Sequence, residues 1–210
     1  MITKLVLDKI ILGISLAAPI GPVSIEMIKR GLKGGFFSAF TIRLGGAMGN
    51  SLCLLGAYFG LSFLLNQPML YNLIGFAGAG FLVYMGASSL LKKQTTINLE
   101  GSNQPILSNG LLVGLFLALA NPIGVVFWFG IFAASMSANQ TTTSFADLCF
   151  NGLIIVGVLL WGAFLSLLLE GGKRIFNNKI ARVVTIVSSL LLLGYGFKYG
   201  FLTFQKLMGL

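Results

Sequence analysis

The polar side chains that lie within otherwise apolar stretches of this chain include Glu26, Arg43, Asn50 and Asn121. Arginine can hold a carboxylate through two parallel hydrogen bonds, and asparagine supplies a neutral donor and acceptor. A carboxylate surrounded by apolar sequence is energetically costly and can carry a proton. These residue types suit reversible binding of a small charged or zwitterionic solute, and we predict no catalytic residue among them.

Each of the four has a simpler interpretation. Glu26 lies three and four residues before Lys29 and Arg30, so it either lines a pathway or forms an ion pair on one helix face at the membrane rim. Arg43 either faces a cavity or, as we favour from sequence, extends to lipid phosphates at the cytoplasmic interface. Asn50 fits a site and an interhelical hydrogen bond equally well. For Asn121 the site is favoured, because the following proline disfavours helical geometry.

Two proline-containing breaks interrupt the apolar sequence, at Ala18-Pro19-Ile20-Gly21-Pro22 and at Ala120-Asn121-Pro122-Ile123-Gly124. Proline frees backbone polar groups that lipid cannot satisfy, so such breaks persist only where protein or water covers them. Paired breaks in corresponding places indicate the binding site of a secondary transporter. We therefore place Pro19, Gly21, Pro22 and Pro122 beside the substrate or ion pathway, with Trp128 as a further candidate.

Composition indicates an integral membrane protein. The chain has 210 residues, of which 56% are hydrophobic and 9% charged, and its mean hydropathy is +0.94. A hydrocarbon core about 30 Å thick needs about 20 residues per helical span, so this length accommodates about six spans. The predicted spans are, in order, Ile10 to Ile28, Phe37 to Leu65, Met69 to Leu91, Leu107 to Met136, Phe145 to Leu169 and Ile180 to Phe204.

The two halves of the chain are similar. Leu16 to Gly21 aligns without a gap on Leu119 to Gly124, an offset of 103 residues, and Gly56 to Phe59 matches Gly162 to Leu165 at an offset of 106. Three spans per half is an odd number, so the second half must enter the membrane from the opposite side. We predict one all-α transmembrane domain (1–210) of two inverted three-helix repeats, about 1–93 and about 105–210, with the first and fourth helices broken at proline.

Basic residues predict the orientation. Nine of them follow the first, third and fifth spans, whereas four lie on the other side: Lys4, Lys9, Lys198 and Lys206. The positive-inside rule then makes the loops after spans 1, 3 and 5 cytoplasmic and places both termini outside. This topology accounts for the net charge of +9 without a nucleic-acid partner.

The sequence resembles the lysine-exporter (LysE/RhtB) family of bacterial amino-acid exporters over nearly its whole length. The resemblance rests on Pro19-Ile20-Gly21-Pro22, on the glycine run Leu44 to Gly49 and on Asn121-Pro122. It implies export of amino acids or their derivatives from the cytoplasm, driven by the proton gradient, across the cytoplasmic membrane of a bacterial-type cell. Many members carry an acidic residue shortly after the glycine run and a lysine after Asn-Pro. Asn50 and Ile123 occupy those positions here, so substrate and coupling do not carry over directly.

Two alternatives stay open. Cys53 and Cys149 lie in the second and fifth predicted spans, which makes a membrane thiol or electron carrier conceivable, but no Cys-x-x-Cys pair exists. A channel for another small solute also fits six spans, although paired breaks favour a transporter. The chain has no histidine and its five acidic residues form no metal-ligand pattern, so we expect no enzyme activity, no cofactor and no metal. The expected partners are the lipid bilayer and a small-molecule substrate, and the short chain is compatible with a homodimer.

Overall fold

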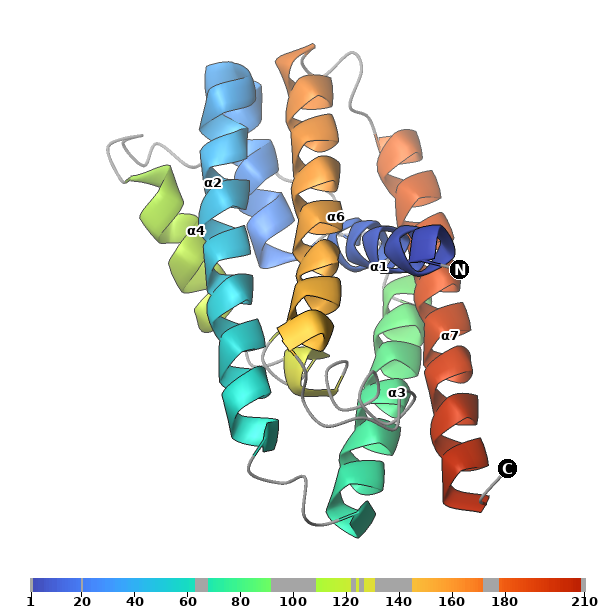
Figure 1. Ribbon diagram of the computed structural model, residues 1–210. Coiled ribbons are helices and arrows are strands. Elements are labelled where there is room, and N and C mark those ends of the chain that lie inside the picture. Colours follow the sequence, from blue (N-terminus) through green and yellow to red (C-terminus); the bar gives the residue numbers. More distant parts are fainter. Residues whose placement is uncertain are drawn as a thin grey trace.

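The computed structural model describes residues 2–19, 21–62, 68–91, 109–121, 124, 127–130, 145–171 and 178–208. Within these residues the backbone is helical almost throughout and contains no strand, which confirms the all-helical class. Most helices run side by side, while α1 crosses the bundle (Figure 1). Ile20, Pro122 and Ile123 of the two predicted breaks lie outside the described residues.

The first predicted break lies between α1 (Ile2–Ala17) and α2 (Pro22–Ser62). Pro19 and Pro22 lack the amide hydrogen that a helix interior needs, and Pro22 stands at the start of α2, where that hydrogen would have no helical partner. The two helices are bent by 73° relative to each other. α1 therefore lies across the bundle instead of continuing into α2.

α2 folds back on itself at Gly35, where φ is 71° and ψ is −160°. A Cβ at Gly31 would lie 3.0 Å from the Cβ of Ala39, and one at Gly46 would lie 3.3 Å from a methyl group of Val23. Residues eight apart on a straight helix are separated by about 12 Å along its axis, so these contacts require two antiparallel arms. The arms are residues 22–34 and 36–62. Only glycine adopts the Gly35 conformation without strain.

The remaining described helices are α3 (Pro68–Leu91), α4 (Gly110–Leu119), α6 (Phe145–Glu170) and α7 (Asn178–Met208), and residues 127–130 are also helical. Asn109 caps α4, its side-chain oxygen accepting a hydrogen bond from the Leu111 amide at 3.2 Å. α4 ends two residues before Asn121, so the second break also coincides with the end of a helix. α2 packs against α4 and α6, α3 packs against α7, and α1 packs against α6 and α7.

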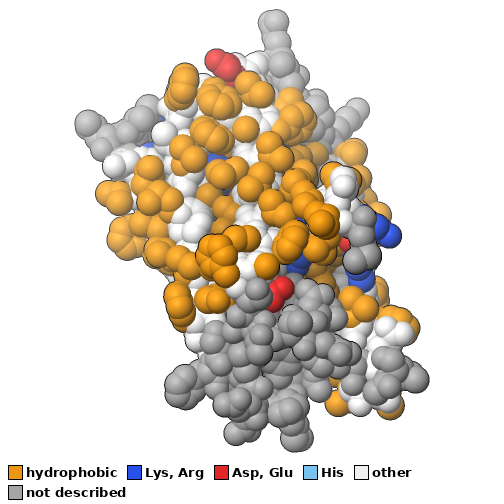
Figure 2. All heavy atoms as spheres, in the orientation of Figure 1, with side chains coloured by type: hydrophobic (Ala, Val, Ile, Leu, Met, Phe, Trp, Pro, Cys, Tyr) orange, Lys and Arg blue, Asp and Glu red, His pale blue; other side chains and the backbone are white. Residues whose placement is uncertain are grey.

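The surface is that of a membrane protein. Phe145–Glu170 and Arg182–Gln205 are each long and apolar enough to cross a bilayer, and the bent pair α1 and α2 makes a third candidate. Gly75–Leu91 and Gly110–Leu119 are shorter apolar helices. Hydrophobic side chains cover most of the described part of the face in Figure 2, with few charged ones among them. The predicted number of six spans stays a prediction.

Where α1 crosses α6, two glycines bring the backbones into direct contact. A Cβ at Gly13 would collide with the backbone oxygen of Ile154, and a Cβ at Gly157 would collide with the backbone oxygen of Ile10. Each glycine thus contacts the residue three positions before the other glycine. Small residues permit such close approach in membranes, where lipid is as apolar as leucine.

The crossing of α2 and α4 repeats this pattern with different residues. A Cβ at Gly114 would collide with the backbone oxygen of Ile42, and a Cβ at Gly45 would collide with that of Leu111. The spacing of three between glycine and carbonyl is the same as at the first crossing. The α1–α6 and α4–α2 pairs therefore share one contact geometry.

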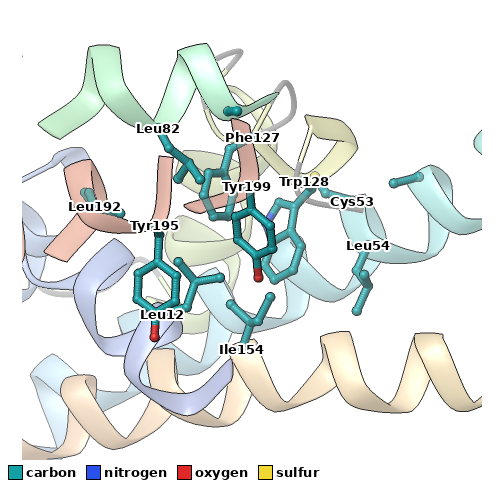
Figure 3. Packing of buried hydrophobic residues seen from close by; sticks show 12 residues of the cluster. Leu12, Cys53, Leu54, Leu82, Phe127, Trp128, Ile154, Leu192, Tyr195 and Tyr199 are labelled. Atoms are coloured by element: carbon teal, nitrogen blue, oxygen red, sulfur yellow. The ribbon is translucent and has the colours of Figure 1, made fainter. Parts of the chain in front are cut away.

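A hydrophobic cluster joins α1, α2, α3, α6 and α7 with the 127–130 turn. In Figure 3, Tyr195 and Tyr199 extend from α7 toward Leu12 and Ile154, and Trp128 lies in the same cluster. The rings of Phe127 and Trp128 meet edge to face, 5.7 Å apart at 81°. Phe127 and Trp128 of this cluster also form part of the wall of the candidate site.

Candidate functional site

A cavity of about 370 Å³ lies between the two helix breaks. α1, both arms of α2, α3, α6 and the segment that follows α4 all contribute to its wall. Most of the site residues predicted from sequence are brought together there: Pro19, Gly21, Pro22, Arg43, Asn50, Asn121 and Trp128. Pro122 lies outside the described residues, so its place is not defined.

Arg43 is enclosed by protein, with 5% of its surface exposed. The interfacial interpretation favoured from sequence is therefore wrong, because the side chain lies against the cavity instead of extending to lipid headgroups. One terminal nitrogen of the guanidinium (Nη2) donates to Ser24 Oγ at 3.3 Å, while Nε has no hydrogen-bond partner in the described part of the chain. A buried donor without a partner is unfavourable, and an anionic ligand would satisfy it.

A glycine on the facing helix makes room for Arg43. A Cβ at Gly162 of α6 would collide with the Cγ of Arg43 and would lie 2.8 Å from its Cδ. The stem of the arginine thus passes directly over the α6 backbone. Any larger residue at 162 would displace the guanidinium from its present place.

Asn121 and Asn50 supply the neutral polar groups of the cavity wall. The backbone N–H of Asn121 donates to the backbone oxygen of Ala118 at 3.4 Å, a contact of the last turn of α4. The carbonyl ends of α1 and α4 both lie at this cavity, together with the amino end of α2. Helix carbonyl ends favour a cation and amino ends favour an anion.

Glu26 is not among the residues that line the cavity. Its carboxylate accepts a hydrogen bond from the Nε of Arg30 at 2.7 Å, and their side chains are 26% and 14% exposed, respectively. This geometry matches the ion-pair alternative considered from sequence. The structure thus separates Glu26 from the other predicted site residues.

The chain matches the family described as LysE type translocator over residues 14–202. This chain belongs to that family. The resemblance found from the two proline motifs is thereby confirmed, and the protein is placed among membrane transporters.

The curated relatives of this LysE-family chain include efflux proteins. It is 28% identical to the putative amino acid efflux protein YcgF of Bacillus subtilis over 97% of this chain and 98% of that protein. It is 25% identical to the leucine efflux protein of Salmonella typhimurium over 83% of this chain and 84% of that protein. No solved structure matches the chain.

Several residues that line the cavity of the translocator were not predicted from the sequence. Beside Tyr84, α3 contributes Met85, Ser88 and Ser89, and the first arm of α2 contributes Ser24. The adjacent serines at the end of an apolar helix are the one signal that could have identified the α3 wall. Ser24 had no such signal, because a single hydroxyl is common in membrane helices.

Lys9 was also not predicted to be buried, because its place near the start of the chain is typical of a basic residue that flanks a membrane span. Its side chain is buried between α1, α6 and α7, away from the cavity lining. Lys9, Gly13 and Ala17 recur every four residues on the buried face of α1, and this spacing was the available signal. Cys53 is buried and Cys149 is exposed, and neither lines the cavity.

Proposed function

We propose that this LysE-family chain exports neutral amino acids from the cytoplasm and binds them in the cavity between the two helix breaks. The observation that carries the proposal is Arg43, a buried guanidinium that lines this cavity and whose Nε has no hydrogen-bond partner among the described residues. Arg43 would bind the substrate carboxylate, with Ser24 orienting the guanidinium. A low-dielectric surrounding strengthens such a charge-assisted pair.

Groups that could hold the substrate ammonium also line the cavity. The carbonyl ends of α1 and α4 carry partial negative charge, and the side-chain oxygens of Asn50 and Asn121 are neutral acceptors. The cavity thus offers a partner for each of the two charges of a zwitterion. None of the described residues that line the cavity is acidic, which disfavours a second positive charge on the substrate.

The rest of the wall suits an apolar side chain. Leu16, Met85, Phe127, Trp128 and Val158 line the cavity, and its volume lies near the lower end of the range for small-molecule pockets. The names of the relatives, an amino acid efflux protein and a leucine efflux protein, support the same substrate class. We propose Leu-like neutral amino acids as the first substrates to test.

The proposed architecture is six spans in two inverted repeats, about 1–93 and about 105–210. In this arrangement α1 corresponds to α4, α2 to α6 and α3 to α7. The α1–α6 crossing then corresponds to the α4–α2 crossing, while the α2–α6 pair and the α3–α7 pair each correspond to themselves. The shared glycine contacts at the two crossings support this relation. The proposal includes the cytoplasmic membrane, cytoplasmic loops after spans 1, 3 and 5, external termini and a proton gradient as the driving force.

Efflux from preloaded cells tests the function. We expect cells that express the wild-type protein to lose leucine or another neutral amino acid faster than an empty host. Arg43→Met should abolish this difference, and Arg43→Lys should retain a small part of it, because a lysine lacks the planar pair of donors. Arg182→Met, which alters an exposed arginine of α7, is the matched control. Wild-type efflux that Arg43→Met leaves unchanged would contradict the assignment of the site.

Purified protein in liposomes separates a transporter from a channel. A transporter driven by an imposed pH gradient should accumulate leucine above its external concentration, whereas a channel only equalises the two concentrations. Equalisation without accumulation would contradict the proposed coupling.

A further inference from the structure

A second buried charge lies outside the cavity, at the junction of α1, α6 and α7. Lys9 is 4% exposed, and its ammonium donates a hydrogen bond to Asn151 Oδ1 at 2.8 Å. The same ammonium lies 5.9 Å from the centre of the Tyr199 ring. Nothing in the proposed binding of substrate uses this group.

The charged groups around Lys9 come from all three helices. Asp147 of α6 and Asp8 of α1 attract its ammonium, and Lys198 of α7 repels it. Lys198 forms an ion pair with Asp8 at 2.7 Å, and their side chains are 49% and 32% exposed, respectively. This pair forms the accessible edge of the cluster, whereas Lys9 lies inside it. Tyr195 donates to the backbone oxygen of Asp8 at 2.8 Å and closes the α7 side.

Asn151 can serve Lys9 in two protonation states. Its side-chain oxygen accepts from the ammonium, while its Nδ2 is buried and has no hydrogen-bond partner in the described part of the chain. An ammonium has only donors, but a neutral amine has a lone pair that the amide N–H could reach after Asn151 turns over. A buried ammonium is costly, and a neutral amine without a hydrogen-bond partner is also unfavourable. Because the Asn151 amide can hydrogen-bond either form of Lys9, it lowers the free-energy cost of releasing the proton.

α1 connects this cluster to the cavity. Lys9 and Gly13 lie on one face of α1, and Gly13 is in backbone contact with α6. Two turns beyond Lys9, Ala17 and then Pro19 line the cavity. Tyr199 belongs to the same packed cluster as Trp128, which also lines the cavity. A movement of α1 at Lys9 would therefore also move the residues of α1 that line the cavity.

We propose that Lys9 is the proton-coupling group of this exporter. Its amine takes up one proton from the water outside the cell, through the Asp8–Lys198 edge, and releases one proton to the cytoplasm for each substrate that moves outward. This inference rests on the proposed export function. It assigns proton and substrate to different sites, Lys9 and Arg43, and α1 joins the two.

Purified protein in liposomes tests the assignment with L-leucine as the probe. Exchange of labelled for unlabelled leucine needs no net proton movement, whereas accumulation under an imposed pH gradient does. Lys9→Arg keeps the positive charge but cannot release a proton. We expect exchange within about threefold of wild type, with the accumulation ratio reduced to about one. Lys9→Gln should behave alike, and Lys4→Arg, an exposed change on the same helix, should accumulate as wild type does.

A purely structural role for the Lys9 charge predicts that Lys9→Arg accumulates leucine normally, and that result would overturn the proposal. If Lys9→Arg does not fold, Asn151→Asp provides the decision, because a carboxylate beside the ammonium should hold its proton and abolish accumulation while exchange persists. Normal accumulation by Asn151→Asp would also overturn the assignment. Failure of the export function itself looks different, because the wild-type protein would then neither exchange nor accumulate leucine or another neutral amino acid.

Discussion

The stem of Arg43 on α2 passes directly over Gly162 on α6, where a Cβ would collide with its Cγ. This contact links the guanidinium in the cavity to a helix in the other half of the chain. The position of the charge therefore depends on a residue that itself bears no functional group.

Gly162→Ala should weaken transport without removing any chemical group. The added methyl displaces Arg43, and we expect KM for leucine export to rise about tenfold, which corresponds to about 1.4 kcal/mol of binding. Gly56→Ala is the matched control, because Gly56 is the sequence counterpart of Gly162 and a Cβ there meets nothing within 4 Å. Efflux kinetics of the two variants at equal membrane abundance provide the measurement. Equal KM values would argue that Arg43 does not bind substrate.

Glu26→Gln should leave transport within about twofold of wild type. The carboxylate is paired with Arg30 at 2.7 Å and does not line the cavity. Such i, i+4 pairs stabilise a helix by only about 0.3–0.5 kcal/mol, so folding should also persist. Efflux from preloaded cells measures the effect. Loss of efflux at normal abundance would instead give Glu26 the pathway role considered from the sequence.

Gly13→Ala and Gly114→Ala should each destabilise the protein by about 1–3 kcal/mol, because each places a methyl group against a backbone carbonyl of the opposing helix. Thermal unfolding in detergent, followed by size-exclusion chromatography, would show a lowered midpoint for both. Gly80→Ala should leave the midpoint unchanged or raise it, since a Cβ there meets nothing within 4 Å and alanine favours a helix. Opposite effects of Gly13→Ala and Gly114→Ala would contradict the equivalence of the two crossings.

Replacement of both cysteines should leave export intact. Cys53 is buried, Cys149 is exposed, and neither lines the cavity. The double variant Cys53→Ala, Cys149→Ala should therefore export leucine within about twofold of wild type in the cell assay. Export that disappears with the thiols, at normal abundance, would revive the thiol-carrier alternative.

The helix breaks could be predicted because proline acts locally. A residue that lacks an amide hydrogen kinks, ends or begins a helix, and Ala17 and Leu119 are the last residues of α1 and α4. Asn121 belongs to the second break, so its place at the cavity agrees with the prediction made from that break. Asn50 lies inside α2, and the sequence left its place at a site or at an interhelical hydrogen bond equally open.

The places of Arg43 and Lys9 depended on tertiary packing. Arg43 stands beside a stretch that is by itself long enough to cross a bilayer, so only the packing of α6 shows that protein encloses it. Lys9 lies near the start of the chain, where a basic residue usually meets water or headgroups. Its burial requires α6 and α7, which are more than a hundred residues away in sequence.

The sequence suggests a repeat through the similarity of the two halves, but it does not give the contact register of the proposed repeat. Sequence similarity pairs Gly56 with Gly162, whereas the helix crossings pair Gly45 with Gly157, a different offset. Glycine is frequent in these helices, so several offsets give similar matches. Which glycines meet a backbone depends on helix geometry, and a one-dimensional comparison does not contain it.

The turn at Gly35 has a consequence for the passage of solute. A single residue joins the two arms of α2, so the arm that bears Ser24 and the arm that bears Arg43 form one rigid hairpin on one side of the cavity. Across the cavity, Ser88 and Ser89 belong to α3, whose principal packing partner among the described helices is α7 and not the hairpin. Among the described helices, the hairpin and α3 do not pack closely on each other, so we expect the wall to open along this boundary when solute passes.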